Sequence, residues 1–126
     1  MMKKLLTAAT LLFLGACGEH PRQPTTEAEL IVEARNCDPF DYALWLEWQD
    51  PTGTWNQIFL FAVYGDPIVG PTQDFADVTV LPGVQYYILL ADADGNLFDT
   101  QTVWLAEGTL VDLHFHIIGG LLVAQS

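Results

Sequence analysis

Basic residues are scarce in this chain of 126 residues. It contains four Lys and Arg residues against 16 Asp and Glu, which gives a formal net charge of −12 at pH 7. Proteins that bind DNA or RNA neutralise backbone phosphates with Lys and Arg, and a strongly acidic surface repels phosphates and anionic head groups. The composition therefore excludes nucleic-acid binding and favours cations or a basic partner. Acidic charge that merely keeps an apolar domain soluble would give the same composition.

Cysteine is also scarce, with Cys17 and Cys37 the only two residues. If Cys17 is chemically modified, Cys37 has no partner within the chain and an intramolecular disulfide is excluded. No lysine or obvious base lies beside Cys37 in the sequence to activate its thiol. We therefore expect Cys37 to be a small buried residue, with a cross-link to another protein as the alternative. The sequence also lacks a Gly-rich phosphate loop and a Ser-His-Asp context, so we predict no enzyme activity.

The N-terminus carries Lys3 and Lys4, an apolar run at residues 5–14, and the sequence Leu14-Gly15-Ala16-Cys17. A basic start followed by a short apolar run is typical of a secretory signal peptide, and the run is too short to span a bilayer. The segment resembles the lipobox of bacterial lipoproteins, whose cysteine receives a diacylglycerol on sulfur and an acyl chain on its new amine. This resemblance implies a signal peptide over residues 1–16, a lipidated Cys17, and a lipid bilayer as the first partner. The alternative is an ordinary signal peptide with a chance cysteine.

The cellular address follows from the same resemblance. In Gram-negative lipoproteins an Asp after the lipidated cysteine signals inner-membrane retention, so Gly18 implies the outer membrane, with the protein facing the periplasm. No later segment reaches about 18 uninterrupted apolar residues, so we predict no transmembrane helix. Residues 17–26 hold the lipidated cysteine and a short tether containing Pro21 and Pro24. Residues 27–126 are predicted to form one domain.

The predicted domain consists of short β-like runs separated by strong turn signals such as Asp-Pro, Pro-Gly and Asp-Gly, with no helical periodicity. We predict strands at residues 28–35, 42–48, 55–64, 74–81, 85–92, 97–105, 109–117 and 121–124. Strands at this spacing without helices predict an all-β fold, an antiparallel β-sandwich of about seven or eight strands, with a small barrel as the alternative.

Two segments resemble the fibronectin type III or a related immunoglobulin-like sandwich. They are Trp45-Leu46-Glu47-Trp48 before a Pro/Gly turn, and Leu81-Pro82-Gly83-Val84-Gln85-Tyr86 opening an apolar strand. In that family a tyrosine in this position forms a corner by bonding backbone a few residues upstream, a role that the resemblance gives to Tyr86. The last strands have no place in the standard seven, so an added hairpin or another sandwich topology is expected. A fold-level likeness of this kind carries no activity.

Turn chemistry also predicts a strand register. A three-residue loop at residues 93–95, with Gly95 left-handed, sets Leu90 opposite Phe98 and Val84 opposite Trp104. Continuing this register predicts a core face comprising Tyr86, Ile88, Leu90, Phe98 and Trp104. A second hairpin turning at residues 107–108 would then set Gln101 against His114 and Asp99 against His116 on the outer face.

The sharpest candidate for chemistry is Asp112-Leu113-His114-Phe115-His116. On a strand, residues two apart project to the same side about 7 Å apart, and two imidazoles at that spacing can converge on a metal ion. His114, His116 and Asp112, with Asp99 predicted opposite His116, are therefore candidate ligands of a divalent metal. A solvated polar face is the alternative. No other cofactor is expected. A calcium site at Asp92, Asp94 and Asn96 is a further alternative, although the EF-hand pattern itself fails there.

Aromatic residues exceed what one inward face requires, and they include Trp45, Trp48, Trp55, Phe59, Phe61, Tyr64 and Tyr87. Either the strand at 55–64 is covered on both faces, or one face is an exposed patch for a partner. The sequence thus predicts a membrane-anchored, non-enzymatic accessory or binding module of the cell envelope that recognises a protein or glycan. The alternative is a metal-binding envelope protein that uses the strand of Asp112, His114 and His116.

Overall fold

The computed structural model describes residues 27–65, 67 and 69–125. These residues form eight strands and no helix, and each strand bound lies within one residue of its predicted position. The strands are β1 (Ala28–Asn36), β2 (Tyr42–Gln49), β3 (Trp55–Val63), β4 (Gln73–Val80), β5 (Gln85–Asp92), β6 (Leu97–Trp104), β7 (Leu110–Ile118) and β8 (Leu121–Ala124). Over the described ranges, no helix has the length and apolar character needed to cross a membrane.

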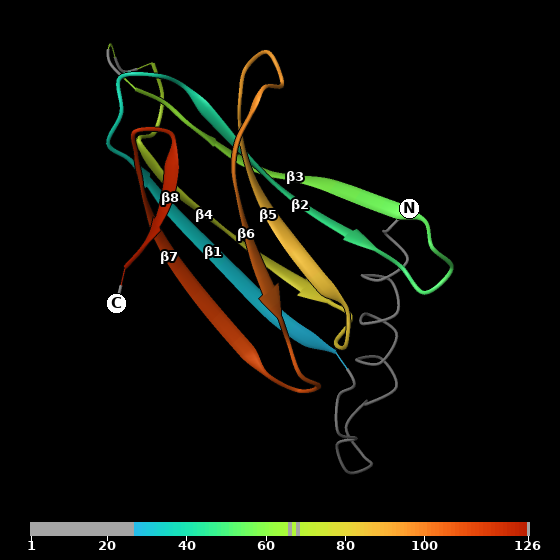
Figure 1. The fold of residues 1–126 in the computed structure, drawn as a ribbon. Coiled ribbons are helices and arrows are strands. Elements are labelled where there is room, and N and C mark those ends of the chain that lie inside the picture. Colours follow the sequence, from blue (N-terminus) through green and yellow to red (C-terminus); the bar gives the residue numbers. More distant parts are fainter. Residues whose placement is uncertain (1–26, 66, 68, 126) are drawn as a thin grey trace.

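The strands form two four-stranded sheets that pack face to face, as Figure 1 shows. The first sheet has the order β4-β1-β7-β8, and the second has the order β3-β2-β5-β6. All neighbours within the two sheets are antiparallel except β1 and β7, which run parallel. The predicted β-sandwich is therefore confirmed, with one parallel pair that the sequence patterns did not predict.

The core lies between the two sheets and follows from the alternation of side chains along each strand. Every second residue of β1, β2 and β5 is buried, which places one apolar side of each strand against the opposing sheet. The largest fully buried side chains are Tyr86, Leu30, Leu44, Leu46, Ile88, Leu90, Leu105 and Ile117. Trp48 is buried beside Tyr86, with ring centroids 5.5 Å apart.

The predicted loop between β5 and β6 is correct, but the register beyond it is wrong. The Asp92 amide donates to the Asn96 carbonyl at 3.0 Å, and Gly95 has a φ of 86°, as a three-residue loop requires. The pairing then shifts, because Leu90 pairs with Asp99 whereas Ala91 pairs with Leu97. Phe98 is the extra residue of a β-bulge, and it reverses the two faces of β6.

As a result, two residues predicted for the core lie outside it. Phe98 is 47 % exposed and Trp104 is 59 % exposed. The inward positions of β6 are instead occupied by Asp99, Gln101 and Val103, all of which are half-buried. Tyr86, Ile88 and Leu90 are buried as predicted.

The predicted hairpin of β6 and β7 does not exist, because the two strands belong to different sheets. The turn after β6 carries the chain across to the start of β1, where the Gly108 amide donates to the Glu27 carbonyl at 3.0 Å. Strand β7 then pairs with β1, so Asp99 does not lie opposite His116. Asp99 instead accepts a 2.7 Å hydrogen bond from the Leu122 amide, which ties the edge of the second sheet to β8 of the first.

The tyrosine corner is present at Tyr86. Its hydroxyl donates to the Leu81 carbonyl at 2.9 Å and accepts from the Leu81 amide at 3.0 Å, across five residues. Burial raises the pKa of Tyr86 to about 12, despite the opposing effect of its hydrogen bond to the Leu81 backbone. The hydrogen bonds to upstream backbone that the fibronectin type III resemblance predicted for this residue are thus present.

Asp38 connects the β1–β2 loop to the tight turn between β7 and β8. Its carboxylate accepts bonds from the Gly119 amide at 2.7 Å, the Gly120 amide at 2.8 Å and the Tyr42 hydroxyl at 2.8 Å. Burial would raise the pKa of Asp38, but these three donors outweigh it and lower the pKa below its usual value. Burial and the bond to Asp38 raise the pKa of Tyr42 to about 12.

Candidate functional site

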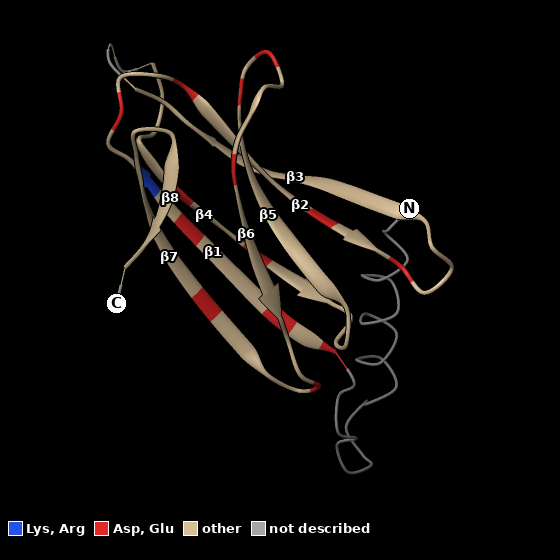
Figure 2. Cartoon of the chain, viewed as in Figure 1, with Lys and Arg blue, Asp and Glu red and all other residues tan. Residues whose placement is uncertain are grey.

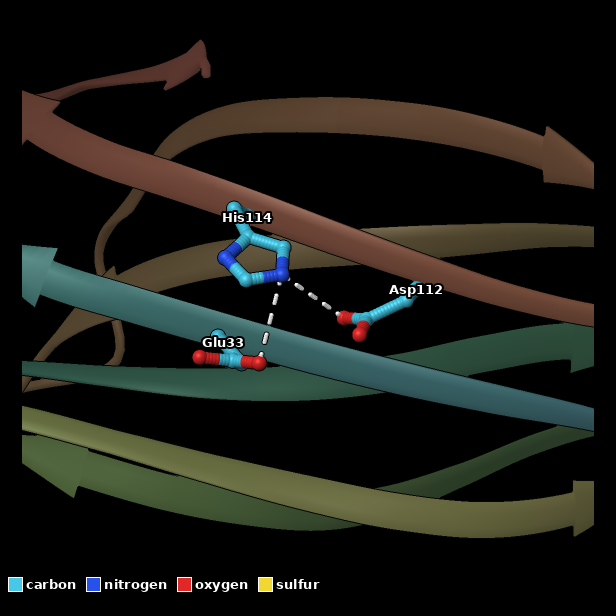
Figure 3. A network of polar contacts seen from close by, with 3 residues as sticks. All are labelled: Glu33, Asp112 and His114. Carbon is cyan, nitrogen blue, oxygen red and sulfur yellow. Dashed lines mark ion pairs between the residues drawn. The ribbon is translucent and has the colours of Figure 1, made fainter. Parts of the chain in front are cut away.

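The first candidate site lies on the outer face of the first sheet. Glu33 on β1 pairs with His114 on the parallel strand β7, and Asp112 precedes His114 by two residues on the same face. The imidazole Nε2 of His114 lies 3.3 Å from Oε2 of Glu33 and 3.1 Å from Oδ1 of Asp112 (Figure 3). One donor atom from each of these residues lies within 4.8 Å of the others. We call these three residues the His114 cluster.

The His114 cluster only partly matches the predicted metal site. His114 and Asp112 are brought together as predicted, whereas Asp99 lies at the far edge of the second sheet. His116 lies two residues after His114 on β7, where strand pairing places it beside Arg35 rather than a carboxylate. Sequence reasoning missed Glu33, because only the parallel pairing of β1 with β7 brings it beside His114.

The geometry of the His114 cluster suits either an ion pair or a metal ion. Tetrahedral zinc ligands at about 2.0–2.1 Å from the metal lie roughly 3.3 Å apart, which is close to the two distances from His114. The imidazole is half exposed, so solvent and a small cation can reach it. A shallow pocket of about 160 Å³ adjoins the cluster, and its lining includes Glu33, Arg35, His114 and His116.

The second candidate site is the outer face of the second sheet. Strand pairing aligns Trp45 with Phe59 and Leu89, and Gln49 with Trp55, so their side chains share this face. Its aromatic members, which we call the aromatic face, are Trp45, Trp55, Phe59, Tyr87 and Trp104.

Three of these five aromatic side chains are more than half exposed, and Trp45 and Tyr87 are half-buried. Trp55, Phe59 and Trp104 are 53 %, 52 % and 59 % exposed. Two pairs of rings are in contact, Trp45 with Phe59 at 5.3 Å between centroids and Trp55 with Tyr87 at 6.0 Å. Exposed aromatic groups this close together are typical of a binding surface rather than of an ordinary sheet exterior.

A groove runs beside the aromatic face, between two turns. It has a volume of about 380 Å³, and Trp55 and Tyr87 line it together with Gln49, Asp50 and Gln85. The groove thus combines aromatic walls with amide and carboxylate groups. Such a combination offers both apolar contact and directed hydrogen bonds to a ligand.

The predicted aromatic excess therefore divides between the core and the surface. Trp48 and Phe61 are buried, whereas Trp55 and Phe59 are exposed. Trp104, predicted to be in the core, joins the aromatic face because of the bulge in β6.

Strand pairing shows that the two outer faces differ in charge. In the first sheet, acidic residues lie on β1, β4 and β7, with Asp112 the single acid of β7 (Figure 2). Arg35 near the end of β1 is the only Lys or Arg among the described residues. On the paired strands of the second sheet, Glu47 is the only charged residue whose side chain lies among the aromatic face. The first sheet thus presents ionisable groups, and the second presents aromatic ones.

Three further candidates have clear outcomes. Cys37, expected to be buried, is exposed, because the residue follows β1 in an open loop. Cys17 lies outside the described residues. Asp92 uses its carboxylate within the β5–β6 turn, where it accepts from the Asp94 and Asn96 amides at 2.9 and 2.8 Å, so turn formation accounts for the calcium-like sequence.

Comparison with known proteins found no protein-family model and no curated protein that matches this chain.

Proposed function

We propose that this protein is a lipid-anchored envelope lipoprotein without enzymatic activity, which binds an envelope protein or glycan through the aromatic face. The single observation that carries the proposal is that three half-exposed aromatic side chains, Trp55, Phe59 and Trp104, lie on the same side of one sheet. Burying such side chains against a partner releases water from apolar surface, at about 25 cal/mol per Å². Aromatic residues of this kind commonly dominate the energy of an interface.

The anchor in this proposal comes from Leu14-Gly15-Ala16-Cys17, which resembles a lipobox. Acylation of Cys17 would hold the domain at the bilayer, and Gly18 favours the outer membrane, with the domain facing the periplasm. Several acyl chains on one cysteine anchor a protein stably, since each buried methylene contributes about 0.8 kcal/mol. Mass spectrometry of the protein from native cells tests this part, and an unmodified Cys17 with the leader attached would contradict it.

We further propose that the sandwich is related to the fibronectin type III fold, with a different topology in the first sheet, where β7 and β8 extend the sheet beside β1. The tyrosine corner at Tyr86 and the order β3-β2-β5-β6 support this assignment. Sandwiches of this kind serve many functions, so the assignment is independent of the binding proposal.

Site-specific photo-crosslinking in native cells tests the binding proposal. A photoreactive amino acid replaces Trp55 or Trp104 on the aromatic face, or Phe75 as a control. Phe75 is 61 % exposed on the outer face of the first sheet, so it matches the others in size and accessibility. We expect discrete cross-linked adducts from positions 55 and 104 and none from position 75. Equal adducts at all three positions, or none at any, would refute the proposal.

A second candidate function is divalent metal binding by the His114 cluster. The observation that favours it is the convergence of one imidazole and two carboxylates within 4.8 Å. We expect zinc to raise the melting temperature of the wild type, and we expect His114→Ala to abolish the increase. His116→Ala is the matched control, because His116 lies on the same strand face but faces Arg35. A wild type that does not respond to zinc would end this candidate.

A further inference from the structure

We propose that the partner of the aromatic face is a protein with an exposed basic segment, and that an Arg or Lys side chain of this segment docks on Glu47. This inference rests on the proposed binding function, and it adds the chemistry of the partner and the residue that selects it. It starts from the position of Glu47 within the second sheet.

Glu47 lies near the centre of the aromatic face. It sits on β2, directly between Gln57 on β3 and Tyr87 on β5, and Trp45 precedes it by two residues on the same face. The ring of Trp55 reaches Tyr87 across this part of the face, with centroids 6.0 Å apart and ring planes inclined at 46°. The carboxylate is thus bordered by aromatic and amide groups.

Among the described residues, none supplies a counter-ion to this carboxylate. Glu47 is half-buried, and it makes no hydrogen bond or ion pair with any described residue. The single Arg of the described part of the chain, Arg35, lies on the outer face of the other sheet. When a partner covers a partly desolvated, unpaired carboxylate, the burial of the charge opposes binding unless the partner supplies a cation.

A cation at this position would gain two kinds of interaction. It would pair with the Glu47 carboxylate through a charge-assisted hydrogen bond, and it would contact the faces of Trp55, Tyr87 or Trp45. The planar guanidinium of Arg stacks on aromatic rings and binds a carboxylate with two donors, so Arg suits the site better than Lys. Neutral or acidic ligands could not offset the charge of Glu47.

The charge of the whole chain acts in the same direction. A formal net charge of −12 attracts basic molecules over distances of a Debye length, and it repels acidic ones. This long-range attraction steers a basic segment towards the protein, whereas Glu47 and its aromatic neighbours determine where the segment binds.

The four tryptophans of this chain provide a direct assay. Trp45, Trp55 and Trp104 lie on the aromatic face, whereas Trp48 is buried in the core and serves as an internal control. The full chain, labelled with ¹⁵N and purified in a neutral detergent, is titrated with a heptapeptide of alternating Gly and Arg. The indole N–H signals are followed by NMR. A peptide with citrulline at each Arg position keeps the shape and removes the charge.

We expect the Arg peptide to shift the signals of Trp45 and Trp55 and to leave Trp48 unchanged, and we expect the citrulline peptide to have little effect. Glu47→Gln should raise the Kd about fivefold or more. Glu29→Gln is the matched control, because it removes one acid from the outer face of the opposite sheet and should change the Kd less than about twofold.

Two results would overturn the inference. One is an equal change in Kd for Glu47→Gln and Glu29→Gln, which would mean that the peptide responds only to net charge. The other is equal binding of the citrulline and Arg peptides. If either occurs while photo-crosslinks at position 55 persist, the aromatic face is a binding site for a partner of different chemistry, and only the inference fails. If the crosslinks are also absent, the proposed function fails as well.

Discussion

Replacing Tyr86 with Phe removes one oxygen atom from the most deeply buried tyrosine of this protein. That oxygen makes two hydrogen bonds to the backbone of Leu81, one as donor at 2.9 Å and one as acceptor at 3.0 Å. The aromatic ring would stay in place beside Trp48, so the apolar packing of the core is largely retained. The substitution therefore isolates the contribution of the tyrosine corner.

The expected loss of stability follows from these two bonds. A buried hydrogen bond contributes about 0.5–1.5 kcal/mol net, and a buried group that loses its partner costs about 1–3 kcal/mol. Tyr86→Phe should therefore lower the free energy of unfolding by about 1.5–3 kcal/mol. For a domain of this size, each 1 kcal/mol corresponds to a change of roughly 4–8 °C in Tm.

Urea denaturation at pH 7, followed by far-ultraviolet circular dichroism, measures this loss as a lower midpoint with an unchanged slope. Tyr87→Phe is the matched control in the adjacent position. Tyr87 lies on the aromatic face, and its hydroxyl makes no hydrogen bond to a described residue, so we expect a change within about 0.5 kcal/mol. Equal midpoints for the two variants would show that the tyrosine corner contributes nothing to stability.

Three other expectations concern residues in the loops between strands. Asp38→Asn should lower the free energy of unfolding by about 2–4 kcal/mol in urea denaturation. Both carboxylate oxygens of Asp38 accept hydrogen bonds from two backbone amides of the β7–β8 turn and from the Tyr42 hydroxyl, whereas an Asn side chain has one acceptor oxygen. A loss below about 0.5 kcal/mol would contradict this. The folded state lowers the pKa of Asp38 below 3.8 and the pKa of Asp50 to about 2, so the stabilisation from both carboxylates is present above about pH 4 and is lost as the pH falls towards 2. The urea midpoint should therefore fall between pH 7, pH 4 and pH 3, and a midpoint that rises on acidification would be inconsistent with this expectation. Gly65→Ala should destabilise by about 1–3 kcal/mol in thermal unfolding, because an added Cβ would collide with the backbone around Pro39; an unchanged Tm would show that the loop yields without cost.

The strands were predictable because their signals are local. Alternating apolar residues and turn dipeptides determine where a strand begins and ends, and all eight predicted strands are present. The tyrosine corner was equally accessible, since Tyr86 and Leu81 are only five residues apart. The loop at residues 93–95 also followed from its own residues, with Gly95 at positive φ.

The candidate sites were less predictable, because each depends on contacts between distant segments. A single extra residue at Phe98 reverses the faces of β6, which moves Trp104 from the predicted core to the aromatic face. Nothing in the local pattern at residues 97–104 distinguishes the two registers. Glu33 joins His114 only because β7 leaves the expected hairpin and pairs in parallel with β1.

The amino-acid sequence alone determined the acidic charge, and it predicted the anchor and the all-β class, because composition, spacing and turn chemistry are properties of short segments. Only the tertiary structure decided which aromatic residues face outward and which carboxylates meet the histidine. Those outcomes depend on strand register and on the choice of neighbouring strands, and both are fixed by the packing of the whole sandwich.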